Sequence, residues 1–237
     1  SAIPWREYQT SNMKTAYNTT FRNNNNTTSF TTFEYKIYDP SNTVVATYPQ
    51  VTFNTDPYTT NGYGNYAPAA TPPITYTIPS PLIGPSKYTM VCAFGANPND
   101  TLASDTLQHV QNFSNYYAYD DGTAGIAFGL STYQGEIAEK FTLGIVPDTL
   151  GCIDAYFNPL WLNANLYNLL YKVRADAGGV PGAELFSSDT HISPTYNHSG
   201  HDQFIRYYLD APLYLTAGAT FYIGYQQNTN QFLNIGV

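Results

Sequence analysis

The sequence predicts an all-β protein made of two tandem β-sandwich domains, the first immunoglobulin-like and the second jelly-roll-like. The composition favours strands and turns, since aromatic residues make up 16% of the chain and charged residues only 11%. Short runs of alternating apolar and polar residues recur between connections rich in Pro, Gly and Asn. The closest approach to a helical period is at residues 162–172, where the Tyr and Asn content favours a strand instead.

The first half of the chain has the pattern of an immunoglobulin-like sandwich, with short strands and Pro-rich connections. Residues 1–29 are rich in Asn and Thr, offer little to bury and are expected to be irregular. A long Asn/Gly/Tyr/Pro loop is expected at residues 54–73. We therefore assign residues 1–111 to this domain. Its strands are predicted at residues 33–38, 44–48, 74–78 and 87–95.

The second half has strand-like runs at nearly regular spacing, and eight short strands separated by turn residues fit a jelly roll. We assign residues 112–237 to this domain. Both ends of the chain resemble cut ends, and the last strand runs to Val237, so this domain is expected to be truncated. The strands are predicted at residues 125–130, 136–143, 151–157, 166–175, 184–187, 203–209, 220–226 and from 232 onward.

The charge of the chain bears on its partners. A net charge of -8 argues against nucleic acid and against anionic membrane surfaces as partners. No apolar run approaches the roughly 18 residues that a membrane-spanning helix needs, so no membrane span is expected. Cys92 and Cys152 lie inside apolar runs without the short spacing of a redox or zinc pair, which favours two buried free thiols over a disulfide.

Residues 116–124 read Tyr-Tyr-Ala-Tyr-Asp-Asp-Gly-Thr-Ala. This run resembles a motif of large surface proteins of Bacteroidota that are exported by the type IX secretion system, where the region normally precedes a C-terminal sorting domain. Two departures are Gly125, where the family usually has Glu, and Tyr225, where it often has Trp. The resemblance covers roughly residues 112–237 and implies an extracellular or cell-surface location. Further matches, in the family's order, are residues 137–141, 173–176, 179–182, 221–227 and 233–236.

Asp-Thr-Leu occurs three times, and it fits the Asp-(Ser/Thr)-aliphatic pattern that such bacteria O-glycosylate outside the cytoplasm. The resemblance therefore makes Thr101, Thr106 and Thr149 candidate O-glycosylation sites. The alternative is that these are plain loop tripeptides.

Two further groups of residues are candidate binding sites. The adjacent carboxylates of Asp120 and Asp121 offer oxygen ligands for calcium, the one cofactor that the sequence suggests, although Asp-Gly is also a common turn former. The rings of Tyr58, Tyr63, Tyr66 and Trp161 lie in loop-like segments, where they are candidates for stacking on sugar rings. The alternative for these rings is packing at edges or between domains.

Nothing in the sequence positions catalytic machinery. There is no Gly-x-Ser-x-Gly elbow, no phosphate-binding loop and no dinucleotide fingerprint. We therefore expect a non-catalytic structural or adhesive module of a secreted cell-surface protein or filament. Carbohydrate binding is the first alternative, and an accessory domain of a secreted hydrolase is the second. The expected partners are other modules of the same or a partner surface protein, the secretion machinery during export, and glycans.

Overall fold

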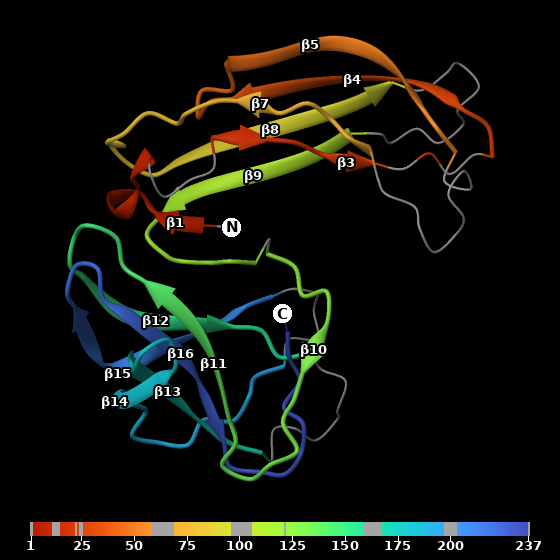
Figure 1. The fold of residues 1–237 in the computed structure, drawn as a ribbon. Helices are drawn as coiled ribbons and strands as arrows, with labels where there is room; N and C mark the ends of the chain where they lie inside the picture. Colours follow the sequence, from red (N-terminus) through yellow and green to blue (C-terminus); the bar gives the residue numbers. More distant parts are fainter. Residues whose placement is uncertain are drawn as a thin grey trace. The chain divides into compact units, whose positions relative to one another are not determined.

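The computed structural model describes residues 2–10, 15–21, 23, 26–57, 69–95, 106–120, 122–158, 167–196 and 203–236. Over these residues the chain forms β-strands and one short 3-10 helix but no α-helix, so the all-β prediction is confirmed. No helix in the described part is long and apolar enough to span a membrane. The chain divides into two compact units, and the division falls between Tyr116 and Tyr117 (Figure 1).

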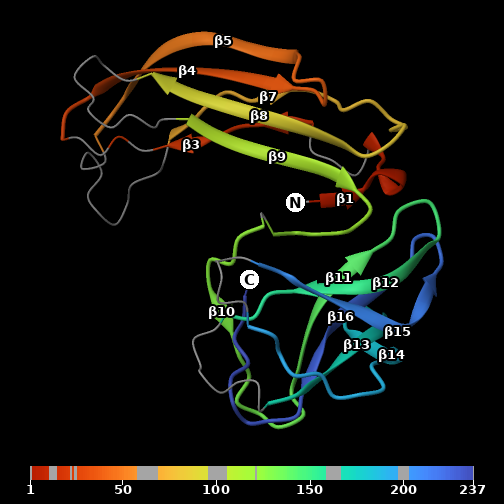
Figure 2. The same cartoon turned by 180° about the vertical axis from the view of Figure 1, so that it is seen from behind.

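The first unit is built on a five-stranded sheet with the order β1-β9-β8-β4-β5. The neighbours pair in antiparallel fashion except β1 and β9, which are parallel. The four long strands lie side by side in both views (Figures 1 and 2). The strands of this sheet are β1 (Ala2–Pro4), β4 (Ser29–Tyr38), β5 (Val44–Thr55), β8 (Ser86–Gly95) and β9 (Thr106–Ser114).

Two short strand pairs accompany the large sheet. One joins β2 (Ala16–Tyr17) to β7 (Ile74–Thr75), and the other joins β3 (Thr20–Phe21) to β6 (Ala69–Ala70). Ile74 of β7 is buried in one cluster with residues of the large sheet, so this pair packs against one of its faces. The other members of that buried cluster are Phe33, Tyr35, Ile37 and Cys92.

A second buried cluster in the first unit surrounds Tyr8, which follows the 3-10 helix η1 (Trp5–Glu7). The Tyr8 hydroxyl donates a hydrogen bond of 2.8 Å to the carbonyl oxygen of Ile78. The Tyr8 ring meets that of Phe113 on β9 edge-on, with 4.8 Å between centroids. The N-terminal segment is therefore anchored to the core by Tyr8, whose ring packs against apolar neighbours and whose hydroxyl group is hydrogen-bonded.

The structure differs from the sequence predictions in the first unit at three places. Strand β9 was not predicted, because polar residues on both of its faces weaken the alternation. The segment 1–29, expected to be irregular, contributes β1, β2 and β3, whose partners are distant in sequence. The expected boundary between residues 111 and 112 falls inside β9, whose pairing with β8 continues to Phe113.

The second unit contains a four-stranded antiparallel sheet with the order β11-β16-β13-β14. Burial alternates over the first six residues of β13, Leu169 to Arg174, as expected for a sheet with one face turned to a core. The strands predicted here overlap the observed ones, with shifted ends. They are β11 (Glu136–Thr142), β13 (Leu169–Asp176), β14 (Pro181–Ser187) and β16 (Thr220–Gln227).

Four more strands of this unit form two pairs. They are β12 (Asp148–Ala155) with β15 (Ile205–Leu215), and β10 (Ala127–Phe128) with β17 (Ile235–Gly236). The chain just beyond β12 links the pairs, because Phe157 bridges to Ile235 and the Gly236 amide donates to the Tyr156 carbonyl oxygen at 2.8 Å. The two pairs are therefore separate two-stranded sheets that the Phe157–Ile235 bridge connects just beyond the end of β12.

The core of the second unit draws on both sets of strands. One buried cluster contains Ala155 and Phe157 together with Leu169, Tyr171 and Tyr225 of the four-stranded sheet. A second cluster combines Leu215 with Val173 and Phe221. Side chains from both layers thus meet in a shared interior, which is the general arrangement of a β-sandwich.

Candidate functional site

The predicted calcium site at Asp120 forms a turn in the structure. The Asp120 Oδ1 atom accepts a hydrogen bond of 2.7 Å from the Gly122 amide, and Gly122 has a φ of 91°, which favours glycine. Burial, and secondarily the charge of Asp120, raises the pKa of Glu139 on β11. Asp121 lies outside the described residues. Within the described ranges, no group of three or more His, Cys, Asp and Glu side chains is placed to hold a metal ion.

Of the predicted sugar-binding and O-glycosylation residues, only Thr106 and Thr149 lie among the described residues. Tyr58, Tyr63, Tyr66, Trp161 and Thr101 all lie outside the described residues. Thr106 and Thr149 are exposed, but Thr106 begins β9 and Thr149 is the second residue of β12. For these two, the interpretation as loop tripeptides is therefore wrong.

The two cysteines are both free and lie in different units. Cys92 is fully buried on β8, as expected, and burial raises the pKa of its thiol. Cys152 on β12 is only half-buried, since it lies next to a β-bulge and opposite the exposed Tyr208.

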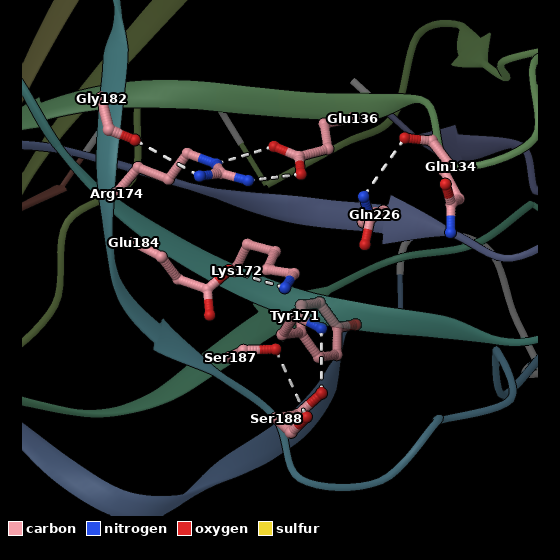
Figure 3. Close-up of polar contacts among 10 residues, drawn as sticks. All are labelled: Gln134, Glu136, Tyr171, Lys172, Arg174, Gly182, Glu184, Ser187, Ser188 and Gln226. Carbon is pink, nitrogen blue, oxygen red and sulfur yellow. Dashed lines mark hydrogen bonds and ion pairs between the residues drawn. The ribbon is translucent and has the colours of Figure 1, made fainter. Parts of the chain in front are cut away.

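The outer face of the sheet β11-β16-β13-β14 carries paired charges, as Figure 3 shows. Arg174 makes a bidentate pair with Glu136, and its third contact is a 3.3 Å hydrogen bond to the Gly182 carbonyl oxygen. Nearby, Lys172 Nζ lies 2.7 Å from Glu184 Oε2. Each of these two cations is paired with a carboxylate of its own sheet.

The strand pair β12–β15 presents exposed tyrosines. Tyr208 and Tyr214 are 76% and 63% exposed and lie opposite Cys152 and Thr149. Two residues before Tyr208 on β15, the guanidinium group of Arg206 forms two hydrogen bonds, of 2.8 and 2.7 Å, to the Asp154 carboxylate. We name this surface the tyrosine face; it combines aromatic area with a neutralised ion pair.

The first unit has a hollow of about 510 Å³ on the large sheet. Its floor contains Thr89 of β8 and Gln108 of β9, and one wall is the turn after β4. Register places Thr89 opposite Tyr38, so both point away from the face that holds the buried Ile37. The residues that line the hollow are Tyr38, Asp39, Pro40, Asn42, Lys87, Thr89, Val91 and Gln108.

Sequence reasoning missed both the hollow and the tyrosine face. Alternation predicts that Tyr38 and Thr89 point away from the core, but only the strand register places them on the same part of the sheet face as Gln108. Tyr208 could have been found as a tyrosine at an outward position of a predicted strand.

Comparison with known proteins adds no assignment. No model of a protein family matches the chain, and no curated protein matches it.

Proposed function

We propose that the chain comprises an immunoglobulin-like domain followed by a jelly-roll domain. In the first unit, the sheet order β1-β9-β8-β4-β5 opposite the pairs β2–β7 and β3–β6 supports an immunoglobulin-like arrangement. In the second unit, the four-stranded sheet β11-β16-β13-β14 and the pairs β10–β17 and β12–β15, which a bridge connects, support an eight-stranded jelly roll. Sheets in both units pair strands from distant parts of the chain, such as β4 with β8 and β11 with β16, as Greek-key connections require.

The proposed function is that of a non-catalytic structural or adhesive module in an exported cell-surface protein. The observation that carries it is the tyrosine face, where Tyr208 and Tyr214 offer large contact areas on the same strand as Arg206 of the Arg206–Asp154 pair. Tyrosine and arginine are enriched in protein interfaces because they combine apolar area with directional hydrogen bonds. The partners we propose are other modules of the same or a neighbouring surface protein.

Two measurements test this function. Antibodies raised against the recombinant chain should label intact cells of its source, and labelling that requires permeabilised cells would contradict the surface location. Immobilised chain should bind the soluble chain or its neighbouring modules, and Tyr208→Ser with Tyr214→Ser should weaken that binding at least about tenfold. Tyr133→Ser is the matched control, since Tyr133 is 53% exposed but lies outside β12 and β15.

Carbohydrate binding is the second candidate, and the same tyrosine face favours it. Exposed tyrosine rings stack on sugar rings, and a paired guanidinium and carboxylate offer donors and acceptors to hydroxyl groups. A glycan array probed with the chain and with Tyr208→Ala tests this candidate. Equal binding by both proteins would remove the tyrosine face as a sugar site.

A further inference from the structure

The hollow on the first unit is formed by residues that share the outer face of the large sheet. The pairing Tyr38–Thr89 places one side chain of β4 beside one of β8. Gln108 on β9 pairs with Val91, two residues after Thr89, so it lies on the same face and diagonal to Thr89. Lys87 is two residues before Thr89 on β8 and therefore points to the same side. Three strands of one sheet thus supply the floor, which makes the arrangement rigid.

The turn that forms one wall is held by its own hydrogen bonds. The Asp39 Oδ1 atom accepts hydrogen bonds from the amides of Ser41 and Thr43, at 2.9 and 2.8 Å. The Asp39 amide donates to the Thr43 carbonyl oxygen, and the Asn42 amide to the Asp39 carbonyl oxygen, both at 2.9 Å. Asn42 takes a φ of 61°, a left-handed conformation that Asn tolerates. A wall fixed in this way loses little conformational entropy when a ligand binds.

The polar side chains of the hollow are available to a ligand. Over the described part of the chain, the side chains of Asn42, Lys87, Thr89 and Gln108 have no hydrogen-bond or ion-pair partner. By contrast, Lys36 on the same face is held by Glu34 at 2.8 Å. The hollow therefore offers one ammonium, two amides and one hydroxyl, all unengaged, next to the Tyr38 ring.

This set of groups fits a ligand rich in hydroxyls. The amides of Asn42 and Gln108 and the Thr89 hydroxyl both donate and accept, as a sugar hydroxyl does. The Tyr38 ring supplies an apolar surface. Lys87 and Asp39 are the two charged residues of the lining, so it is neutral overall and an anion would meet the Asp39 carboxylate. The volume, about 510 Å³, lies within the usual range for small-ligand sites.

We propose that this hollow is a binding site for a neutral saccharide, with Tyr38 under the sugar ring and Lys87, Thr89 and Gln108 bonded to its hydroxyls. The site extends the proposed adhesive function from protein contacts to glycan contacts, and it lies in the first unit. Its residues are separate from the tyrosine face, so the two proposals fail or succeed independently.

The test is an NMR titration of the isotope-labelled chain with neutral trisaccharides: maltotriose, xylotriose, mannotriose and N-acetylchitotriose. At least one should shift the backbone amide signals of Thr89 and Gln108. The variants Lys87→Met and Gln108→Ala should each weaken binding about tenfold, which corresponds to about 1.4 kcal/mol. Lys36→Met is the matched control, because Lys36 lies on the same face and is engaged by Glu34, and it should leave the affinity unchanged.

Four outcomes would overturn the proposal. The first is the absence of shifts with every trisaccharide, and the second is shifts confined to residues 117–236. The third is preferential binding of trigalacturonate, a carboxylated trisaccharide, which would show that the site selects anions. The fourth uses Thr89→Val, which removes the hydroxyl group but keeps the shape of the side chain, so the variant should still fold. Unchanged saccharide affinity in the folded Thr89→Val variant would count against the site. Failure of self-association by the Tyr208 and Tyr214 variants does not affect these readouts.

Discussion

Arg174 on β13 reaches across β16 to Glu136 on β11, with its Nη2 and Nε atoms 2.6 and 2.8 Å from the two carboxylate oxygens. In the strand register, Arg174 lies opposite Tyr222 and Glu136 lies opposite Gln226. A line between the two side chains therefore crosses β16 at Gly224, which has no side chain to obstruct it. Gly224 also allows close approach to β11, because a Cβ atom there would overlap the carbonyl oxygen of Ile137.

Substituting Gly224 should destabilise the second unit. A methyl group at this position meets the backbone of Ile137 and Ala138, which cannot move without disturbing the β11–β16 pairing. Gly224→Ala should therefore lower the free energy of unfolding by about 1–3 kcal/mol, the usual cost of overpacking. Urea unfolding followed by circular dichroism measures this change.

Gly151→Ala is the matched control for that prediction. Gly151 also lies within a strand, β12, but an added Cβ atom has no neighbour within 4 Å. Its substitution should change stability by less than about 1 kcal/mol. Equal destabilisation by the two alanines would contradict the steric explanation and indicate a general cost of alanine in these strands.

Loss of a buried tyrosine hydroxyl group should lower the free energy of unfolding at Tyr8 but not at Tyr225. The Tyr8 hydroxyl donates to the Ile78 carbonyl oxygen, so Tyr8→Phe leaves a buried acceptor unpaired and should cost about 1–3 kcal/mol. The buried hydroxyl of Tyr225 has no hydrogen-bond partner among the described residues. Tyr225→Phe should therefore be neutral or stabilising by about 1 kcal/mol.

Thermal and urea unfolding of both variants distinguish these cases. Tyr225→Ala serves as the positive control, since removing the whole ring from the core should cost about 3–5 kcal/mol. A Tyr225→Phe variant that is as destabilised as Tyr8→Phe would show that the Tyr225 hydroxyl is bonded in solution, for instance to a buried water.

High pH should unfold the protein through its buried tyrosines. Burial raises the pKa of both Tyr8 and Tyr196 to about 12, from an ordinary value of 10.0, and it also raises the pKa of Tyr171 and Tyr225. The folded chain thus binds more protons than the unfolded chain above pH 10. Stability is fully present below pH 10 and falls as the pH rises towards 12.

The measurement is a parallel titration of tyrosinate absorbance and circular dichroism. Part of the tyrosinate signal should appear only together with loss of the β-sheet signal, whereas the chain in guanidinium should titrate as one class near pH 10. Full ionisation of all tyrosines with the β-sheet signal intact would contradict burial of these hydroxyls.

Alternation of apolar and polar residues predicted the strands whose burial is one-sided. Phe33, Tyr35 and Ile37 are buried on β4, and the intervening residues are not, so a period of two is visible in the sequence. Strand β9 lacks this alternation of apolar and polar residues, since the polar Gln111 is buried on it as well as the apolar Phe113. The strands that pair with β9 are β8 and β1. Pairing between distant segments, which no local pattern encodes, determines that strand and the N-terminal ones.

The same limit applies to the hollow. Each of its residues belongs to an ordinary strand or turn, and Asp39-Pro40-Ser41-Asn42 is recognisable as a turn from the sequence. The adjacency of Tyr38, Thr89 and Gln108 depends on the register of β4 with β8 and of β8 with β9, which a slip of one residue would abolish. The sequence therefore predicted the parts of this site but not their assembly.

The two thiols should differ in reactivity with Ellman's reagent. Cys92 is 1% exposed and burial raises its pKa, so little thiolate is present or accessible in the folded chain. Cys152 is half-buried at the β12 bulge, opposite the exposed Tyr208. One thiol should therefore react quickly in the native protein and the second only on unfolding. Cys152→Ser should abolish the fast phase and Cys92→Ser should leave it unchanged. If neither thiol reacts until a reductant is added, the cysteines are joined by a disulfide, and the free thiols of the two separate units would be disproved.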